Sequence, residues 1–85
     1  MKYVFSKHAL EQMFNRSIQE ANVIETMVNP DDIINEEENQ FIYQKTFQNK
    51  VGLDNYMIKV FINGNNDPGL IKTLYLTTKL NKYLK

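Results

Sequence analysis

Residues 18–34 read IQEANVIETMVNPDDII, and the hydrophobic period changes within this stretch. Up to Val28 the apolar residues recur every three or four positions, which is typical of an amphipathic helix over 18–28. Asn29-Pro30 ends that pattern, because proline disfavours helical backbone in the residue before it. Beyond Pro30 the apolar residues tend to alternate with polar ones, which is the period of a strand. The pattern therefore predicts helices before Pro30 and strands after it.

A first helix is expected upstream, over 7–15, where apolar residues again recur at helical spacing. Ser6 precedes this run and is a suitable N-cap. Ser17 and Glu20 have the spacing of a capping box for the second helix. Because only two or three residues separate the two helices, a tight helical hairpin is expected.

The rest of the chain reads as short strands separated by turn signals rich in Asn and Gly. Loops this short suit antiparallel neighbours, because a parallel crossover needs a longer connection. The fold class predicted is α+β: one domain over 1–85, with an N-terminal helical hairpin packed on an antiparallel β-sheet meander. The expected strands are 2–5, a short one at Ile33 and Ile34, 40–48, 55–62 and 70–77.

Periodicity also predicts which side chains form the core. On 55–62 every second residue is apolar, and that row is expected to meet the helices. Lys72 interrupts the corresponding apolar row of Leu70, Leu74 and Leu76 on the last strand, and Ile71 is placed on the reverse face. The side chains predicted to be almost fully buried are Leu10, Phe14, Ile24, Ile58, Val60, Ile62 and Leu74.

The strand 40–48 carries Phe41, Tyr43, Lys45 and Phe47 in one row. If this row joins the row of Lys59, one sheet face mixes lysines with aromatic rings. Such a face suits RNA, because lysines contact phosphates and rings stack on bases. Alternatively, the aromatic side chains pack under the C-terminal tail.

The composition limits the class of protein. The chain has 85 residues, 42% of them hydrophobic, as expected of one small folded domain. No apolar run approaches the roughly 18 residues of a transmembrane helix, and no signal peptide is visible. The lack of Cys excludes disulfide scaffolds and thiolate zinc sites and fits a reducing compartment. A cytoplasmic protein without membrane contact is expected.

The zero net charge conceals a division along the chain. Residues 1–40 carry three basic and eight acidic side chains, whereas 41–85 carry seven lysines and two acids. The basic half could attract an anionic polymer such as RNA. Alternatively, the two halves neutralise each other within one small fold.

His8 is the single histidine, and it falls in the first turn of the expected first helix. Gln12 and Arg16 follow at four-residue spacing, so the three lie on one polar stripe. A helix N-terminus disfavours added positive charge, which favours a neutral imidazole able to accept a proton. The alternative is an ordinary surface or capping histidine. Because no metal-ligand spacing, phosphate-binding loop or dinucleotide motif is present, neither metal nor cofactor is expected.

Three segments in order carry a resemblance to a known family. The chain resembles a widespread family of small prokaryotic proteins, a domain of unknown function often found with mobile elements, which is similar to RelE- and BrnT-type toxins of toxin–antitoxin modules. The segments are Ser6–Met13 leading to Arg16-Ser17-Ile18, then Ile42–Lys45 with Tyr56–Phe61, and finally Ile71–Lys79 with Lys82-Tyr83.

The resemblance implies a RelE-like, microbial-ribonuclease-type fold and a metal-independent endoribonuclease, in which the ribose 2′-hydroxyl attacks the adjacent phosphate. It assigns catalysis to His8, Lys59 and Lys79, with His8 as general acid or base. Three positions depart from the family: Ser17 stands where Gly is usual, and Lys59 and Leu76 stand where Arg is common. The residues it assigns to RNA binding are Arg16, Lys45, Thr77, Lys82 and Tyr83.

Two other functions stay open at this point. One is a non-catalytic module of the same fold that binds RNA or a protein such as a cognate antitoxin. The other is a homodimer whose aromatic sheet face forms the interface. The loss of Arg at Leu76 and the neutral charge favour a binding module, whereas the basic C-terminal half favours the ribonuclease.

Overall fold

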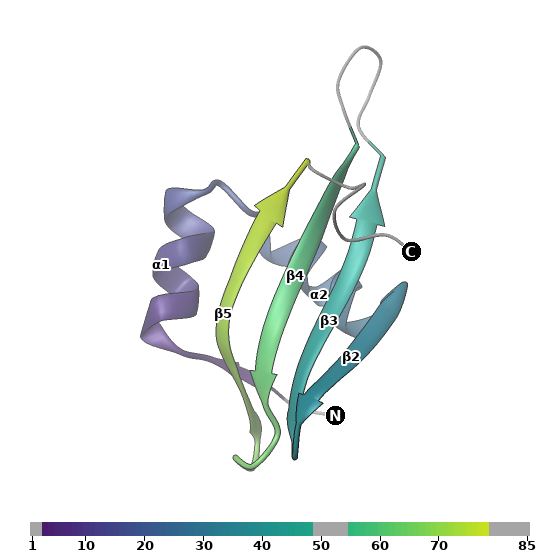
Figure 1. The fold of residues 1–85 in the computed structure, drawn as a ribbon. Helices are drawn as coiled ribbons and strands as arrows, with labels where there is room; N and C mark the ends of the chain where they lie inside the picture. Colours follow the sequence, from purple (N-terminus) through teal and green to yellow (C-terminus); the bar gives the residue numbers. More distant parts are fainter. Residues whose placement is uncertain (1–2, 49–54, 79–85) are drawn as a thin grey trace.

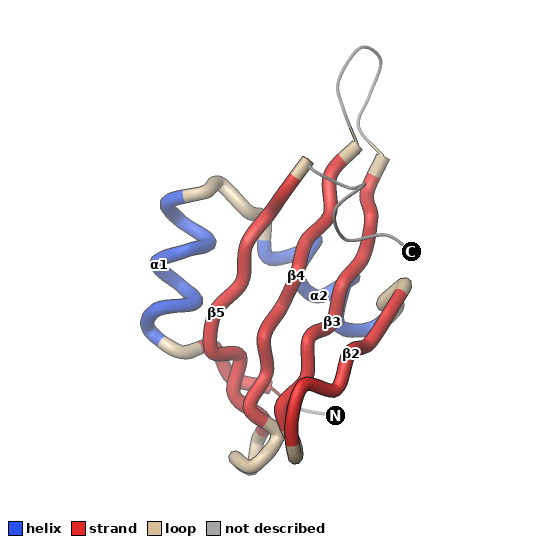
Figure 2. Tube along the Cα trace, in the orientation of Figure 1, coloured by secondary structure: helices blue, strands red, loops and turns tan. Residues whose placement is uncertain are grey.

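The structure is a computed structural model that describes residues 3–48 and 55–78 (Figure 1). It has a five-stranded sheet with two helices, so the α+β class is confirmed. Figure 2 shows the strands side by side, with the helical segments beside and behind them. In chain order the elements are β1 (Tyr3–Phe5), α1 (Lys7–Asn15), α2 (Glu20–Val28), β2 (Asp32–Glu37), β3 (Gln40–Phe47), β4 (Tyr56–Asn63) and β5 (Gly69–Thr77).

The strand order in the sheet is β1-β5-β4-β3-β2. The strands β2 to β5 form the expected antiparallel meander, each paired with the next along the chain. The first strand changes the overall type of sheet, because β1 pairs parallel to β5 through Val4 and Leu70. The sheet is therefore mixed, with its single parallel pair at one edge.

The helices precede the meander but do not form the expected hairpin upon it. Helix α1 packs on β5 and β1, whereas α2 packs on β4 and β3. Figure 1 shows α1 beside β5 and α2 crossing behind the middle strands. Because each helix packs on different strands, the contacts that position the helices are those with the sheet.

The turn between the helices explains why the expected capping box does not form. Ser17 has a φ of 53°, in the left-handed region. Its N–H donates to the carbonyl of Phe14, and that of Ile18 donates to Met13, which together close a Schellman motif after α1. Ser17 therefore belongs to the turn that terminates α1 and does not cap α2. The N-cap of α2 is Gln19, which makes no side-chain capping bond.

The core lies between the helices and the sheet. The burial predicted for Ile58, Val60, Ile62 and Leu74 is confirmed. The burial predicted on the helices is wrong: Leu10 is 53% exposed, Phe14 85% and Ile24 50%. The helices instead turn Ala9, Val23 and Thr26 toward the sheet.

The error on α1 has a simple geometric cause. Ala9 and Met13 form one stripe at i,i+4 spacing, and Leu10 and Phe14 form the next. Both stripes are apolar, so periodicity alone does not choose between them. The small Ala9 side chain is fully buried, which allows the helix backbone to approach β5 closely.

Neither nine-residue helix in the described ranges has the length or the apolar run that crossing a membrane requires.

Candidate nucleic-acid interface

The sheet has two unlike faces. Both helices cover one of them, which we call the helix face, and no described element covers the other, which we call the open face. The register between β3 and β4 decides which side chains share a face. Lys45 lies opposite Ile58, and Gln44 lies opposite Lys59. Because Ile58 belongs to the core beneath the helices, Lys45 lies on the helix face and Lys59 on the open face.

This register overturns the expected face on which the row of Phe41, Tyr43, Lys45 and Phe47 joins the row of Lys59. Phe41, Tyr43 and Phe47 share the helix face with Lys45, opposite the core residues of β4. Phe47 stacks on Tyr56 there, with ring centroids 5.4 Å apart. Phe61 lies on the open face with Lys59, where it is paired with Ile42.

The centre of the open face is a row of three polar side chains from three strands. Gln44 lies opposite Lys59, and Lys59 lies opposite Tyr75. Gln44 is 3% exposed and Lys59 is 7% exposed, so an amide and an ammonium group are buried side by side. Among the residues that the structure describes, the Oε1 atom of Gln44 has no hydrogen-bond partner. A buried oxygen of this kind costs free energy unless a donor reaches it.

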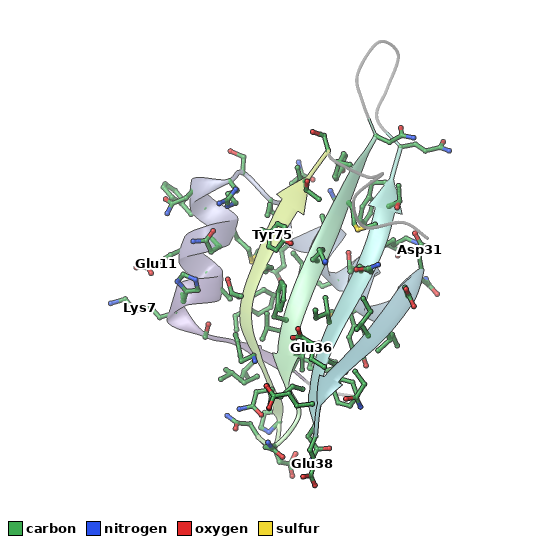
Figure 3. The ribbon with its side chains drawn as sticks, in the orientation of Figure 1. Lys7, Glu11, Asp31, Glu36, Glu38 and Tyr75 are labelled. Atoms are coloured by element: carbon green, nitrogen blue, oxygen red, sulfur yellow. The ribbon has the colours of Figure 1, made fainter. Side chains whose placement is uncertain are left out.

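Aromatic rings border this row. The Nζ atom of Lys59 lies 6.0 Å from the ring centroid of Tyr75, at the outer limit of a cation–π contact. The Tyr75 ring also stacks on that of Phe61, with centroids 5.8 Å apart and planes at 24°. Figure 3 shows Tyr75 on the face of the sheet turned toward the viewer. Both rings are half-buried and keep some surface for a ligand.

A β-bulge adds a second cation to the open face. Thr73 pairs with Phe61 and Ile71 pairs with Ile62, so Lys72 is the extra residue of β5. Its Nζ atom reaches across β4 and donates to Oε1 of Gln40 at 2.7 Å. The bulge also reverses two expected placements, because Ile71 enters the core and Lys72 leaves the apolar row of the leucines.

The bulge also anchors the start of α1. The Ser6 hydroxyl donates to the carbonyl of Lys72 at 2.7 Å and accepts from the N–H of Ala9 at 3.0 Å. The predicted N-cap is thereby confirmed. His8, two residues on, is exposed in the first turn of α1.

The end of β5 lies near the end of α1 and away from its start. The link after α1, at Ser17 and Ile18, borders one hollow together with Leu76 and Thr78. Thr77 lies five residues beyond the Lys72 anchor, a distance of about 16 Å along an extended strand. The end of β5 is thus close to the end of α1, whereas the start of α1 is fixed at the bulge.

The other predicted site residues are dispersed. Lys45 donates to the carbonyl of Asn29 at 3.0 Å and lies 3.5 Å from the Asp31 carboxylate. Arg16 is exposed, and its Nε atom donates to Gln12 at 2.9 Å. Thr77 pairs with Met57 at the end of β5. Lys79, Lys82 and Tyr83 lie outside the described residues.

Sequence reasoning did not single out Gln44, Lys72 or Tyr75 as members of the site on the open face. No pattern singled out Gln44, because its importance comes from a buried oxygen without a partner. Lys72 did leave a signal, since a lysine within an apolar row indicates that the strand changes face at that point. Within residues 3–48 and 55–78, no three His, Cys, Asp or Glu side chains gather as a metal site would require.

The fold and the site define a class: a small α+β domain whose mixed sheet is covered by helices on one face and carries a polar, aromatic row on the other. Residues 5–76 match the family described as Domain of unknown function (DUF4258), so the chain belongs to this family. Comparisons with curated proteins and with solved structures gave no significant match.

Proposed function

We propose that this domain binds single-stranded RNA on its open face and acts as a toxin of a toxin–antitoxin module. The observation that supports this most directly is the row of Gln44, Lys59 and Tyr75. It places an unpartnered amide oxygen, an ammonium group and an aromatic ring on neighbouring strands. Proteins hold single-stranded RNA by combining cations for the phosphates with rings that stack on the bases.

The two lysines of the open face suit the phosphate backbone. The described partner of Lys72 is the neutral amide of Gln40, so its charge is not cancelled there. Lys59 is 7% exposed, so its ammonium group would reach a phosphate once its side chain turns outward. The half-buried rings of Tyr75 and Phe61 lie alongside and offer stacking surface.

The unpartnered oxygen of Gln44 is buried, and it would serve recognition once its side chain turns toward a bound ligand. An acceptor that lacks a donor favours a ligand carrying an N–H or O–H group. RNA carries both, in the amino groups of its bases and in the 2′-hydroxyl of its ribose. Single-stranded DNA lacks the 2′-hydroxyl, so a preference for RNA over DNA is expected.

We further propose that the toxin cleaves RNA without a metal, as an endoribonuclease. In this reaction the 2′-oxygen forms a bond to the adjacent phosphorus and the bond to the 5′-oxygen breaks. The 2′-hydroxyl proton passes to a base, and the leaving oxygen receives a proton. His8 is the candidate for proton transfer, because it is exposed and its helix starts at the Lys72 bulge. Lys59 and Lys79 remain the predicted stabilisers of the phosphate charge.

Fluorescence anisotropy with a labelled single-stranded RNA of about ten nucleotides tests the binding step. We expect Lys59→Ala and Tyr75→Leu each to weaken binding by about tenfold, an effect of the size of one stacking or phosphate contact. Lys45→Ala is the matched control, because it removes the same charge from the opposite face. Equal losses for Lys45→Ala and Lys59→Ala would exclude the open face as the RNA site.

Cleavage needs a separate assay, in which labelled RNA is incubated with the protein in excess EDTA and the products are separated. We expect fragments that end in 2′,3′-cyclic phosphate, and their loss in His8→Ala. Lys7→Ala is the control, since it alters the neighbouring exposed residue of α1. RNA that is bound but left intact would make the protein a binding module, and full activity of His8→Ala would remove the histidine from the reaction.

A further inference from the structure

We propose that the outer edge of β2 is a docking site for an extended basic segment of another protein, which adds to the sheet as a sixth strand. Apolar and cationic side chains alternate along the segment that fits this edge. The surface lies apart from the Gln44–Lys59–Tyr75 row, and its occupant is a protein segment. The inference therefore stands independently of RNA binding.

The edge is accessible along its whole length. β2 is the terminal strand of the sheet, and all six of its residues, Asp32–Glu37, are exposed. Among the described residues, its main chain pairs with β3 on one side only. An exposed edge presents unpaired N–H and C=O groups that can pair with a further strand.

The charge of this edge determines what kind of strand it accepts. Five acids fall within residues 31–38, and Figure 3 shows Asp31 at one end of β2 and Glu38 at the other. Lys45 compensates Asp31, and this is the only ion pair formed within the described ranges. The remaining carboxylates repel a second copy of β2 and attract lysine or arginine.

An apolar hollow beside the edge explains why the partner segment would carry apolar side chains as well as cationic ones. It has a volume of about 700 Å³ and lies on the helix face, between α2 and the strands. Exposed side chains of α2 and β2 form its outer wall, namely Ile24, Val28 and Ile33. Val28 is 68% exposed, so this wall has an apolar surface that a partner can cover.

Strand geometry joins these two features into one pattern. Side chains of an added strand point alternately to the two faces of the sheet. Those on the helix face would meet Ile33 and Val28, and those on the open face would meet Asp32 and Glu37, with Ile34 between these two acids. The partner segment therefore carries Val, Ile or Leu at every second position and Lys or Arg between them.

The probe for this proposal is a synthetic peptide of about eight residues, alternating valine and lysine, with both ends blocked. Added to the ¹⁵N-labelled full chain, it should shift amide signals of residues 31–37 together with those of Val28. A peptide that alternates valine and glutamate is the control for charge. Because only one edge of the added strand pairs with β2, N-methylation of one alternating set of peptide amides should abolish binding while the other set is tolerated.

Variants of the protein separate strand addition from simple attraction of charges. Glu36→Gln with Glu37→Gln and Glu38→Gln should weaken binding by about tenfold, whereas Glu11→Gln, an acid on α1, should leave it unchanged. Ile33→Ser should weaken binding of the valine–lysine peptide and leave the thermal midpoint nearly unchanged, because Ile33 is exposed.

Three results would overturn the proposal. The first is no binding at about 1 mM peptide, beyond which an affinity has no recognition value. The second is binding that tolerates both sets of N-methyl groups, which would mean that no strand is added. The third is a dimer of the free protein in sedimentation that is broken by Ile33→Ser, because a second copy would then occupy the edge.

Discussion

Lys45 and Lys59 lie on directly neighbouring strands, offset by one residue in register, yet their side chains leave the sheet on opposite faces. Gln44 is the residue opposite Lys59, and Lys45 is opposite the core residue Ile58. The offset gives the two lysines different environments. Lys45 is held by Asp31 and the carbonyl of Asn29, whereas Lys59 lies beside Gln44 and Tyr75. This pair therefore provides a direct test of which face binds RNA.

The first prediction concerns the salt dependence of RNA binding. Each lysine–phosphate contact releases counterions, so removing one contact should flatten the plot of log affinity against log salt by about one unit. We expect this change for Lys59→Ala and for Lys72→Ala, and no change for Lys45→Ala. Titrations between roughly 50 and 200 mM salt measure the slope. A slope near zero for the unaltered protein would mean that no phosphate is contacted.

The second prediction concerns the turn after α1. Ser17 has a positive φ, which costs an L-residue with a Cβ atom more than it costs glycine. Ser17→Gly should therefore raise the free energy of unfolding by about 1 kcal/mol, as expected for the left-handed position of a Schellman motif. Urea denaturation followed by circular dichroism measures the change.

Glu11→Gly provides the control for that change. It lies within the same helix at an exposed position, so the added glycine should destabilise by about 0.5–1 kcal/mol. If both glycine variants lower the midpoint, the left-handed conformation of Ser17 is wrong.

The third prediction compares two leucines in the core and on the surface. Leu74 is fully buried and Leu10 is about half exposed. Leu74→Ala should cost about 2–5 kcal/mol, through lost burial and the cavity left behind. Leu10→Ala should cost about 0.5 kcal/mol or less, because little of its contact area is in the core. Equal losses at the two sites would show that α1 turns its other stripe toward the sheet.

The fourth prediction concerns stability at high pH. Burial, together with the hydrogen bond to Tyr43 at 3.4 Å, raises the pKa of Tyr3 to about 12. In the unfolded chain this phenol titrates near the ordinary value of 10. The unfolded state therefore releases its proton first, and the stability held by Tyr3 falls as the pH rises from about 10 toward 12.

Tyrosinate absorbance measures this directly. We expect one of the five tyrosines to ionise near pH 12, and that component to disappear in Tyr3→Phe. The variant should also lose less stability than the unaltered protein over the same pH range. A titration curve that Tyr3→Phe leaves unchanged would assign the late component to another tyrosine.

Residues 18–34 already contained the main division of the fold. The change of period at Pro30 separates helices from strands because the two structures repeat every 3.6 and every 2 residues, and this repeat is local. The Ser6 cap could also be predicted from the sequence, because a cap depends on neighbouring residues. The meander of β2 to β5 could be predicted because short loops between alternating segments leave few other arrangements. His8 was placed in the first turn of α1 for the same reason.

The tertiary structure alone decided which stripe of a helix and which row of a strand faces the core. Leu10 and Phe14 offer as good an apolar stripe as Ala9 and Met13, and only contact with β5 selects the second. A one-residue change of register moves a whole row of side chains to the other face of the sheet. For this reason Lys45 and Lys59 lie on opposite faces. The bulge at Lys72 likewise places Ile71 in the core and Lys72 on the open face. These choices depend on contacts between residues distant in the chain, which no local pattern contains.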